Sequence, residues 1–204
     1  MSHTTSTSIP KKQKKVLIIA GSPNVLKHER NLDYYDIIIK LNCIPQDPQY
    51  DKYISSRCDI WAFSSHLTFR TRPKKQLSDH LLNNRMQTPL KWVYSAKLWR
   101  QFQFKKWSKS HPNINPFQII SLKQCMFFHK KHKFKPKKTL STGMATIIHA
   151  MVQYKDITLL GFTSQLEENP HFYDSCKPVG IHDFKKENQI IENWIATGKL
   201  KTID

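Results

Sequence analysis

Short apolar runs bounded by turn-forming residues recur along this chain, and they constrain its fold more than any other feature. They predict buried strands at residues 16–20, 36–40, 59–63, 91–94, 118–121 and 157–160. Helical spacing of apolar residues predicts helices at residues 141–154 and 183–197, the second stopped by Gly198. Strands that alternate with helices indicate an α/β fold, with a Rossmann-like and mostly parallel sheet flanked by helices. Such sheets bind ligands at the carboxyl ends of their strands.

Length and composition predict one folded domain. With 204 residues, of which 39% are hydrophobic and 11% aromatic, the chain can bury a core of its own. We expect a disordered basic tail at residues 1–14 and a single domain at residues 15–204. The apolar run at residues 16–20 is too short for a signal peptide or a membrane span, so a soluble, cytoplasmic protein is expected.

The chain is strongly basic. Lys and Arg number 33 against 15 Asp and Glu, which gives a formal net charge of +18 and a field that attracts anions. Nucleic acid, nucleotide substrates and an anionic membrane touched peripherally all meet this requirement. The stretch at residues 97–138 is basic, rich in aromatic residues and weakly periodic. We interpret it as a basic lid or an insertion that faces a substrate.

Small polar residues follow the first two predicted strands. Gly21, Ser22 and Asn24 come after the first strand, and Asn42 comes after the second. A turn of this kind lets backbone N–H groups and amide side chains approach a phosphate or a ribose. Glycine and small polar residues are also common in ordinary turns between a strand and a loop, so this motif alone does not decide the function.

A Ser-Thr-Gly sequence opens the predicted helix at residues 141–154. Ser141, Thr142 and Gly143 would present hydroxyl and N–H groups at the positive end of that helix, where an anion is stabilised. A plain helix cap is the alternative reading.

A cluster of histidine, tyrosine and glutamate lies near the end of the chain. His171 and Tyr173 precede His182, and Glu187 follows in the last predicted helix. The unperturbed pKa of histidine, about 6.5, suits it to act as a general base near neutral pH. Either histidine alone could equally be a surface or structural residue.

Taken in order, these motifs resemble the eukaryotic-type sialyltransferases, glycosyltransferase family 29. Residues 16–24 with 36–42 look like the large motif of that family, and residues 140–143 with 159–162 look like its small motif. Residues 171–173 lie where the third motif of the family belongs. His182 and Glu187 match the last motif of the family, His-x4-Glu. The likeness covers residues 15–62 and 139–190 and implies a GT-A-like fold in a small, soluble microbial or viral member.

The resemblance implies an inverting transfer of sialic acid from CMP-sialic acid to a sugar hydroxyl. His182 would be the catalytic base and His171 would stabilise the departing phosphate, while Glu187 would support the His182 loop. The implied donor site consists of Gly21, Ser22, Asn24, Asn42, Ser141, Thr142, Gly143 and Tyr173. The implied partners are a CMP-sugar donor and a glycan acceptor. The resemblance does not cover residues 97–138, which stay interpreted from their composition as a basic lid or an acceptor-facing insertion. No cofactor and no metal are implied, and the sequence has no Asp-x-Asp pair to hold a divalent ion.

Three other readings stay open. The same scaffold could use another nucleotide sugar, or the chain could be an inactive relative kept as an interaction module. It could also be a basic nucleic-acid-binding protein that stacks bases on the aromatic residues of 97–138. The residues that would stack in this reading are Trp99, Phe102, Phe104, Trp107, Phe127 and Phe128. This last reading is not favoured, because it leaves His171 and His182 unexplained.

Overall fold

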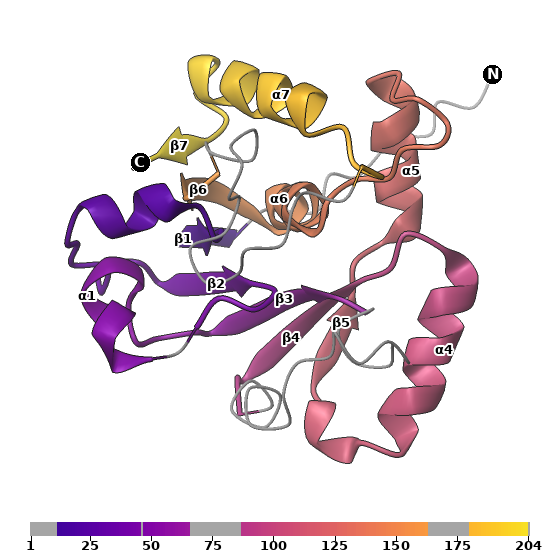
Figure 1. Ribbon diagram of the computed structural model, residues 1–204, viewed down its shortest axis with the longest axis horizontal. Coiled ribbons are helices and arrows are strands. Elements are labelled where there is room, and N and C mark those ends of the chain that lie inside the picture. Colours follow the sequence, from indigo (N-terminus) through magenta and orange to yellow (C-terminus); the bar gives the residue numbers. More distant parts are fainter. Residues whose placement is uncertain (1–11, 46, 66–86, 163–179, 204) are drawn as a thin grey trace.

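The computed structural model describes residues 12–45, 47–65, 87–162 and 180–203. Within these ranges the strands form one seven-stranded sheet in the order β5-β4-β3-β2-β1-β6-β7, and neighbouring strands run parallel (Figure 1). The strands are β1 (Lys12–Ile19), β2 (Ile37–Leu41), β3 (Ile60–Ser64), β4 (Leu90–Tyr94), β5 (Phe117–Ile119), β6 (Tyr154–Leu160) and β7 (Lys201–Thr202). The α-helices are α1 (Asp51–Ile54), α4 (Leu98–Lys109), α5 (Leu122–Lys131), α6 (Thr142–Gln153) and α7 (Phe184–Ala196). Short 3-10 helices are η1 (Pro23–Lys27), η2 (Pro48–Tyr50) and η4 (Pro112–Ile114).

The predicted α/β fold is confirmed, and so are the six predicted strands and both predicted helices. Val16, Leu17, Ile18 and Ile19 are fully buried, as expected for a central parallel strand whose two faces are both covered. The sequence missed β7, because a strand of this length leaves no alternation to read. Strand β1 begins at Lys12, inside the range 1–14 that the sequence assigns to a tail.

The stretch at residues 97–138 is built into the domain more firmly than its weak periodicity indicates. It contains α4, the edge strand β5 and α5. The sequence did not predict its helices, because each helix has apolar side chains on both its buried side and its exposed side. Phe104 and Phe128 are buried, whereas Phe102 and Phe127 are exposed. Whether this stretch also covers an acceptor stays a prediction.

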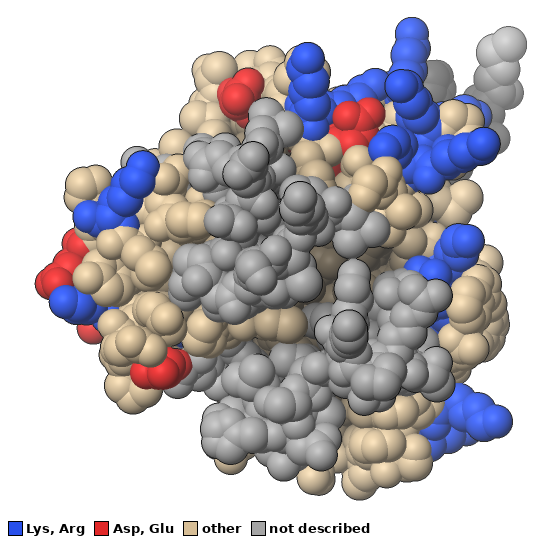
Figure 2. Space-filling model, viewed as in Figure 1, with Lys and Arg blue, Asp and Glu red and all other residues tan. Residues whose placement is uncertain are grey.

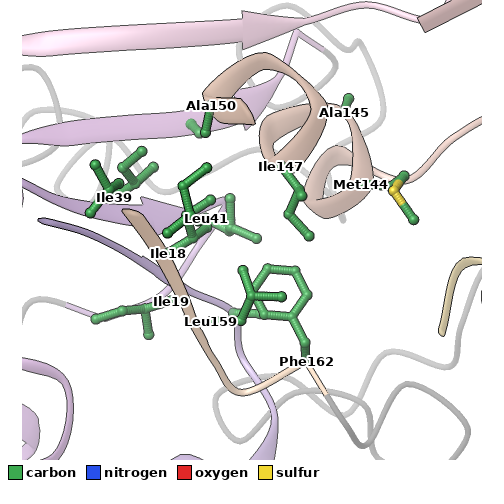
Figure 3. Packing of buried hydrophobic residues seen from close by; sticks show 14 of the residues in the cluster. Ile18, Ile19, Ile39, Leu41, Met144, Ala145, Ile147, Ala150, Leu159 and Phe162 are labelled. Carbon is green, nitrogen blue, oxygen red and sulfur yellow. The ribbon is translucent and has the colours of Figure 1, made fainter. Parts of the chain in front are cut away.

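Helices cover both faces of the sheet. On one face α6 packs against the central strands, and Ile147 points toward Leu41 and Phe162 (Figure 3). On the other face, Phe104 of α4 joins a smaller cluster, whose remaining members are Trp61, Phe63, Val93 and Ile114. The two apolar clusters lie against one continuous sheet, so the described residues form a single domain.

The strand order reverses at β1. The chain moves from β1 outward through β2, β3 and β4 to β5, and then returns to β6 on the other side of β1. The carboxyl ends of β2, β1 and β6 therefore meet at a switch point, where ligands of open α/β sheets bind. In the part of the chain that the structure describes, we find no helix with both the length and the apolar character needed to cross a membrane.

Candidate active site

The turn after β1 is tied to the end of β6. The Ala20 N–H donates to the Leu160 carbonyl at 2.8 Å, and the Ser22 N–H donates to the Gly161 carbonyl at 3.3 Å. The Ser22 hydroxyl accepts a bond from the Asn24 N–H at 3.2 Å and so opens η1. Ser22 is 1% exposed, and Asn24 is half-buried. The predicted donor-site residues of this turn therefore lie at the carboxyl edge of the sheet, and Gly21, just before Ser22, is buried as well.

This turn depends on a glycine at position 161. Gly161 has a φ of +77°, and a Cβ built on it would lie 2.5 Å from Val25 Cγ1 and 2.6 Å from the Ala20 carbonyl oxygen. Both distances are shorter than real Cβ contacts allow, so only glycine lets the chain leave β6 this close to the β1 turn.

Asn42 connects the ends of β2 and β3. Its backbone has a φ of +46°, a left-handed conformation that Asn tolerates better than most residues. Its side-chain oxygen accepts a bond from the Ser64 N–H at 3.3 Å, and its backbone carbonyl accepts one from Trp61 Nε1 at 2.7 Å. The amide is therefore held at the same sheet edge as the β1 turn.

The N-terminus of α6 points to this edge. A Cβ built on Gly143 would lie 3.1 Å from Phe162 Cε1 and 3.5 Å from Leu41 Cδ1, so the first turn packs closely on the ends of β6 and β2. Ser141 caps the helix, because its hydroxyl accepts a bond from the Met144 N–H at 3.1 Å. The N–H groups of Thr142 and Gly143 have no acceptor among the described residues, as is usual for the first turn of a helix.

Glu187 of α7 binds the same helix start. Its carboxyl accepts bonds from the Ser141 N–H at 2.8 Å and from the Ser141 hydroxyl at 2.6 Å. Glu187 is 1% exposed, and burial raises the pKa of its carboxyl to about 7, although the bonds from Ser141 oppose that shift. The Ser141 hydroxyl therefore donates to a protein carboxyl, whereas its predicted contact with a donor substrate is not tested by this geometry.

His182 lies two residues before α7, next to its N-cap Asp183 and beside the loop that leads to α6. Its Nδ1 lies 2.8 Å from the Thr139 carbonyl oxygen, and the Thr139 N–H donates to the Ile181 carbonyl at 3.0 Å. A carbonyl only accepts, so Nδ1 carries the proton and the neutral ring keeps its lone pair on Nε2. Burial lowers the pKa of His182, the bond to Thr139 opposes this, and nearby Lys138 lowers the pKa further.

The His182 loop has a second support that the sequence did not reveal. Lys138 Nζ donates to the Gly180 carbonyl at 2.5 Å and lies 3.4 Å from the His182 carbonyl oxygen. His129 Nε2 bonds the Lys138 carbonyl at 2.9 Å and anchors this loop to α5. The sequence does not single out Lys138 or Thr139. Lys138 contacts backbone carbonyls, and Thr139 contacts His182 through its own carbonyl, so neither contact requires a recognisable sequence motif.

A buried tyrosine at the end of β4 was also not singled out from the sequence. Burial raises the pKa of the Tyr94 phenol, and the Cys125 thiol and the Glu187 carboxyl add to that shift. Tyr94 of β4 is therefore buried within electrostatic range of α5 and of the Glu187 carboxyl. His171 and Tyr173 lie outside the described residues, so their predicted roles are not tested.

Comparison with known proteins identifies the family. The family model of glycosyltransferase family 29 (sialyltransferase) matches residues 18–199, which is most of the chain. The chain belongs to glycosyltransferase family 29. This family membership and the fold make it a glycosyltransferase of the sialyltransferase type. A search by sequence among curated proteins finds no match.

Solved sialyltransferases share the fold. A mammalian sialyltransferase in complex with Gal-beta-1-3GalNAc-ortho-nitrophenol is 13% identical with a TM-score of 0.67, over 94% of this chain and 69% of that one. The sialyltransferase CstII from Campylobacter jejuni, in complex with the substrate analogue cytidine-5'-monophosphate, is 17% identical with a TM-score of 0.62, over 95% and 80% of the chains. A CstII structure with a trisaccharide acceptor and CMP gives a TM-score of 0.55 at 16% identity, over 93% and 80%. At these identities the likeness establishes the GT-A-like fold of this family 29 chain.

Proposed function

We propose that this family 29 chain transfers sialic acid from CMP-sialic acid to the hydroxyl of a glycan acceptor, with His182 as the base. The observation that carries the proposal is the 2.8 Å bond between His182 Nδ1 and the Thr139 carbonyl. It fixes the tautomer, so that Nε2 can take a proton. The lowered pKa of His182 keeps the ring neutral, which is the form that a base requires.

The reaction is a single displacement. The acceptor hydroxyl oxygen forms a bond to the anomeric carbon of sialic acid while the bond from that carbon to the phosphate oxygen of CMP breaks. The hydroxyl proton goes to His182 Nε2, and the bonding electron pair leaves with CMP. This route needs no metal, since one phosphate leaves rather than a diphosphate. In the described part of the chain we find no group of three metal-ligating side chains, and the metal-free route itself remains part of the proposal.

The donor would lie across the switch point. The N–H groups of Thr142 and Gly143 would stabilise the phosphate at the positive end of α6. Asn24 and Asn42, held at the ends of β1 and β2, would donate to the phosphate and the ribose. His171 would neutralise the leaving phosphate, as the family resemblance implies.

The test separates binding from chemistry. Calorimetric titration with CMP, with UMP and AMP as controls, is made at moderate salt so that the +18 charge does not bind every nucleotide. We expect selective binding of CMP. Equal binding of the three nucleotides would contradict the proposed donor and favour another nucleotide sugar.

His182→Ala then tests the base. Transfer should fall by about 10²–10⁴, the usual contribution of a general base, while CMP affinity stays within about twofold. His28→Ala is the matched control, because His28 is exposed and lies at the end of η1. Loss of CMP binding together with transfer, or full transfer by His182→Ala, would contradict this role.

A further inference from the structure

Large apolar side chains are exposed on the two helices next to the edge strand β5. Leu98, Trp99 and Phe102 of α4 are 61%, 51% and 67% exposed, and Met126 and Phe127 of α5 are 62% and 70% exposed. Helix α4 precedes the edge strand β5 in the chain and α5 follows it. The two helices pack on opposite faces of the sheet, and both lie at the β5 edge of the molecule, on the right in Figure 1. We call these five side chains, with the lysines of α4 and α5, the α4–α5 surface. Exposed apolar groups gathered in this way usually mark a binding surface.

The charge around these side chains has one sign. The stretch at residues 97–138 contains twelve Lys and Arg and no Asp or Glu. On α5, Lys123 precedes Met126 and Phe127 by about one helical turn, and Lys130 and Lys131 follow them by about one turn. In Figure 2 the right-hand rim, where α4 and α5 lie, is blue and tan, whereas the red patches lie at the top and on the left.

This combination matches an anionic lipid surface better than a nucleic acid. Helices that lie in a membrane interface insert Trp, Phe and Leu side chains and place Lys and Arg at the headgroups. Leu98 and Met126 can enter the acyl region but offer no ring to stack on a base. Phe104 and Phe128, which the sequence offered as stacking groups, are in the core at 0% and 8% exposure.

We propose that the α4–α5 surface docks the protein on an anionic lipid bilayer, with Phe102 and Phe127 inserted and the flanking lysines at the headgroups. Docking here would also place the candidate site near the bilayer. The segment that follows α5 is bonded to α5 through His129 and Lys138, and it carries the Thr139 carbonyl that holds His182.

Sedimentation of the full chain with vesicles tests this proposal without any need for catalysis. Vesicles of mixed phosphatidylglycerol and phosphatidylcholine are compared with vesicles of phosphatidylcholine alone. We expect strong binding to the anionic vesicles only. Phe102→Gln and Phe127→Gln should each weaken that binding by at least about fivefold, and the double variant should weaken it more. Tyr34→Gln removes an aromatic side chain that is 57% exposed outside this surface, and it should bind as the wild type does.

A charge-matched pair distinguishes a local surface from the net charge of +18. Lys130→Gln with Lys131→Gln should weaken binding by more than about tenfold, since each lysine near an anionic membrane contributes about fivefold. Lys27→Gln with Lys199→Gln removes the same charge from exposed positions elsewhere and should have little effect. Circular dichroism and thermal melting check that each variant is folded.

Three results would overturn the proposal. If the two double-lysine variants lost vesicle binding equally, the binding would come from the net charge of the protein and not from the α4–α5 surface. Unchanged binding by Phe102→Gln and Phe127→Gln would exclude insertion. Tighter binding of single-stranded RNA than of vesicles, lost in the same phenylalanine variants, would assign the surface to nucleic acid.

Discussion

The Glu187 carboxyl accepts two hydrogen bonds from Ser141, one from its backbone N–H and one from its hydroxyl, at 2.8 Å and 2.6 Å. This contact joins α7, which follows His182, to the start of α6, which faces the ends of β2 and β6. The candidate base and the proposed phosphate-binding helix end are thus held by one buried pair. Substrate-binding geometry and stability should therefore respond to the same residues.

A double-mutant cycle measures this pair. Glu187→Ala leaves a buried N–H without an acceptor, and Ser141→Ala removes one donor and the helix cap, so each should destabilise the protein by about 1–3 kcal/mol. The double variant should cost less than the two single variants added together, with a coupling free energy of about 0.5–3 kcal/mol from urea unfolding. Glu192→Ala, at an exposed position of α7, is the control and should cost less than about 0.5 kcal/mol. If the losses of unfolding free energy in the two single variants added up to the loss in the double variant, Glu187 and Ser141 would not interact directly.

The raised pKa of Glu187 predicts a pH dependence of stability. In the unfolded chain this carboxyl ionises near its ordinary pKa of 4.5, whereas in the folded protein its pKa is about 7. Between these values the folded state holds more protons than the unfolded state, so the contribution of Glu187 to stability falls as pH rises from 4.5 to 7 and is constant above. Glu187→Gln removes this slope, and the difference in unfolding free energy between the wild type and the variant isolates it from other titrating groups. A difference that is constant across this range would show that the pKa of Glu187 is not raised.

Two glycines with similar backbone angles should respond differently to alanine. Gly161 and Gly198 have φ values of +77° and +69°, but a Cβ at Gly161 would meet Val25 and the Ala20 carbonyl, whereas nothing lies within 4 Å of one at Gly198. Gly198→Ala should lower the free energy of unfolding by about 1 kcal/mol, because alanine is strained in a left-handed backbone conformation. Gly161→Ala should cost at least about 2 kcal/mol, because the β1 turn must also move, and it should weaken CMP binding. Equal melting temperatures for the two variants would show that the β1 turn adapts freely.

The sequence predicted the strands and the order of the motifs because both depend on local pattern. Val16, Leu17, Ile18 and Ile19 are apolar without alternation, which indicates a strand covered on both faces. The burial of Glu187 also had a signal, since it lies at the helical spacing of Ile190, Ile191 and Trp194 on the buried face of α7.

The contacts that define the candidate site could not be predicted in the same way. His182 is oriented by a backbone carbonyl of residue 139, and the approach of two chain segments so far apart in sequence leaves no mark on residue type. The helix α4 was missed for a related reason. Its apolar residues divide between a buried side, with Phe104, and an exposed side, with Leu98 and Phe102, so they do not form one stripe.

Burial of His182, with a smaller contribution from Lys138, should lower the acid limit of the proposed reaction. Burial lowers the pKa of His182, and Lys138 lowers it further, so His182 stays neutral at a lower pH than an exposed histidine does. The acid limb of kcat/KM should therefore have its midpoint below the ordinary histidine pKa of 6.5. Lys138→Gln removes the nearby positive charge and should move this midpoint upward, whereas Lys137→Gln, at an exposed neighbouring position, should leave it unchanged. Titration of the His182 ring by NMR gives the same pKa without turnover, so a shift in the ring pKa without one in kcat/KM would show that another group is the base.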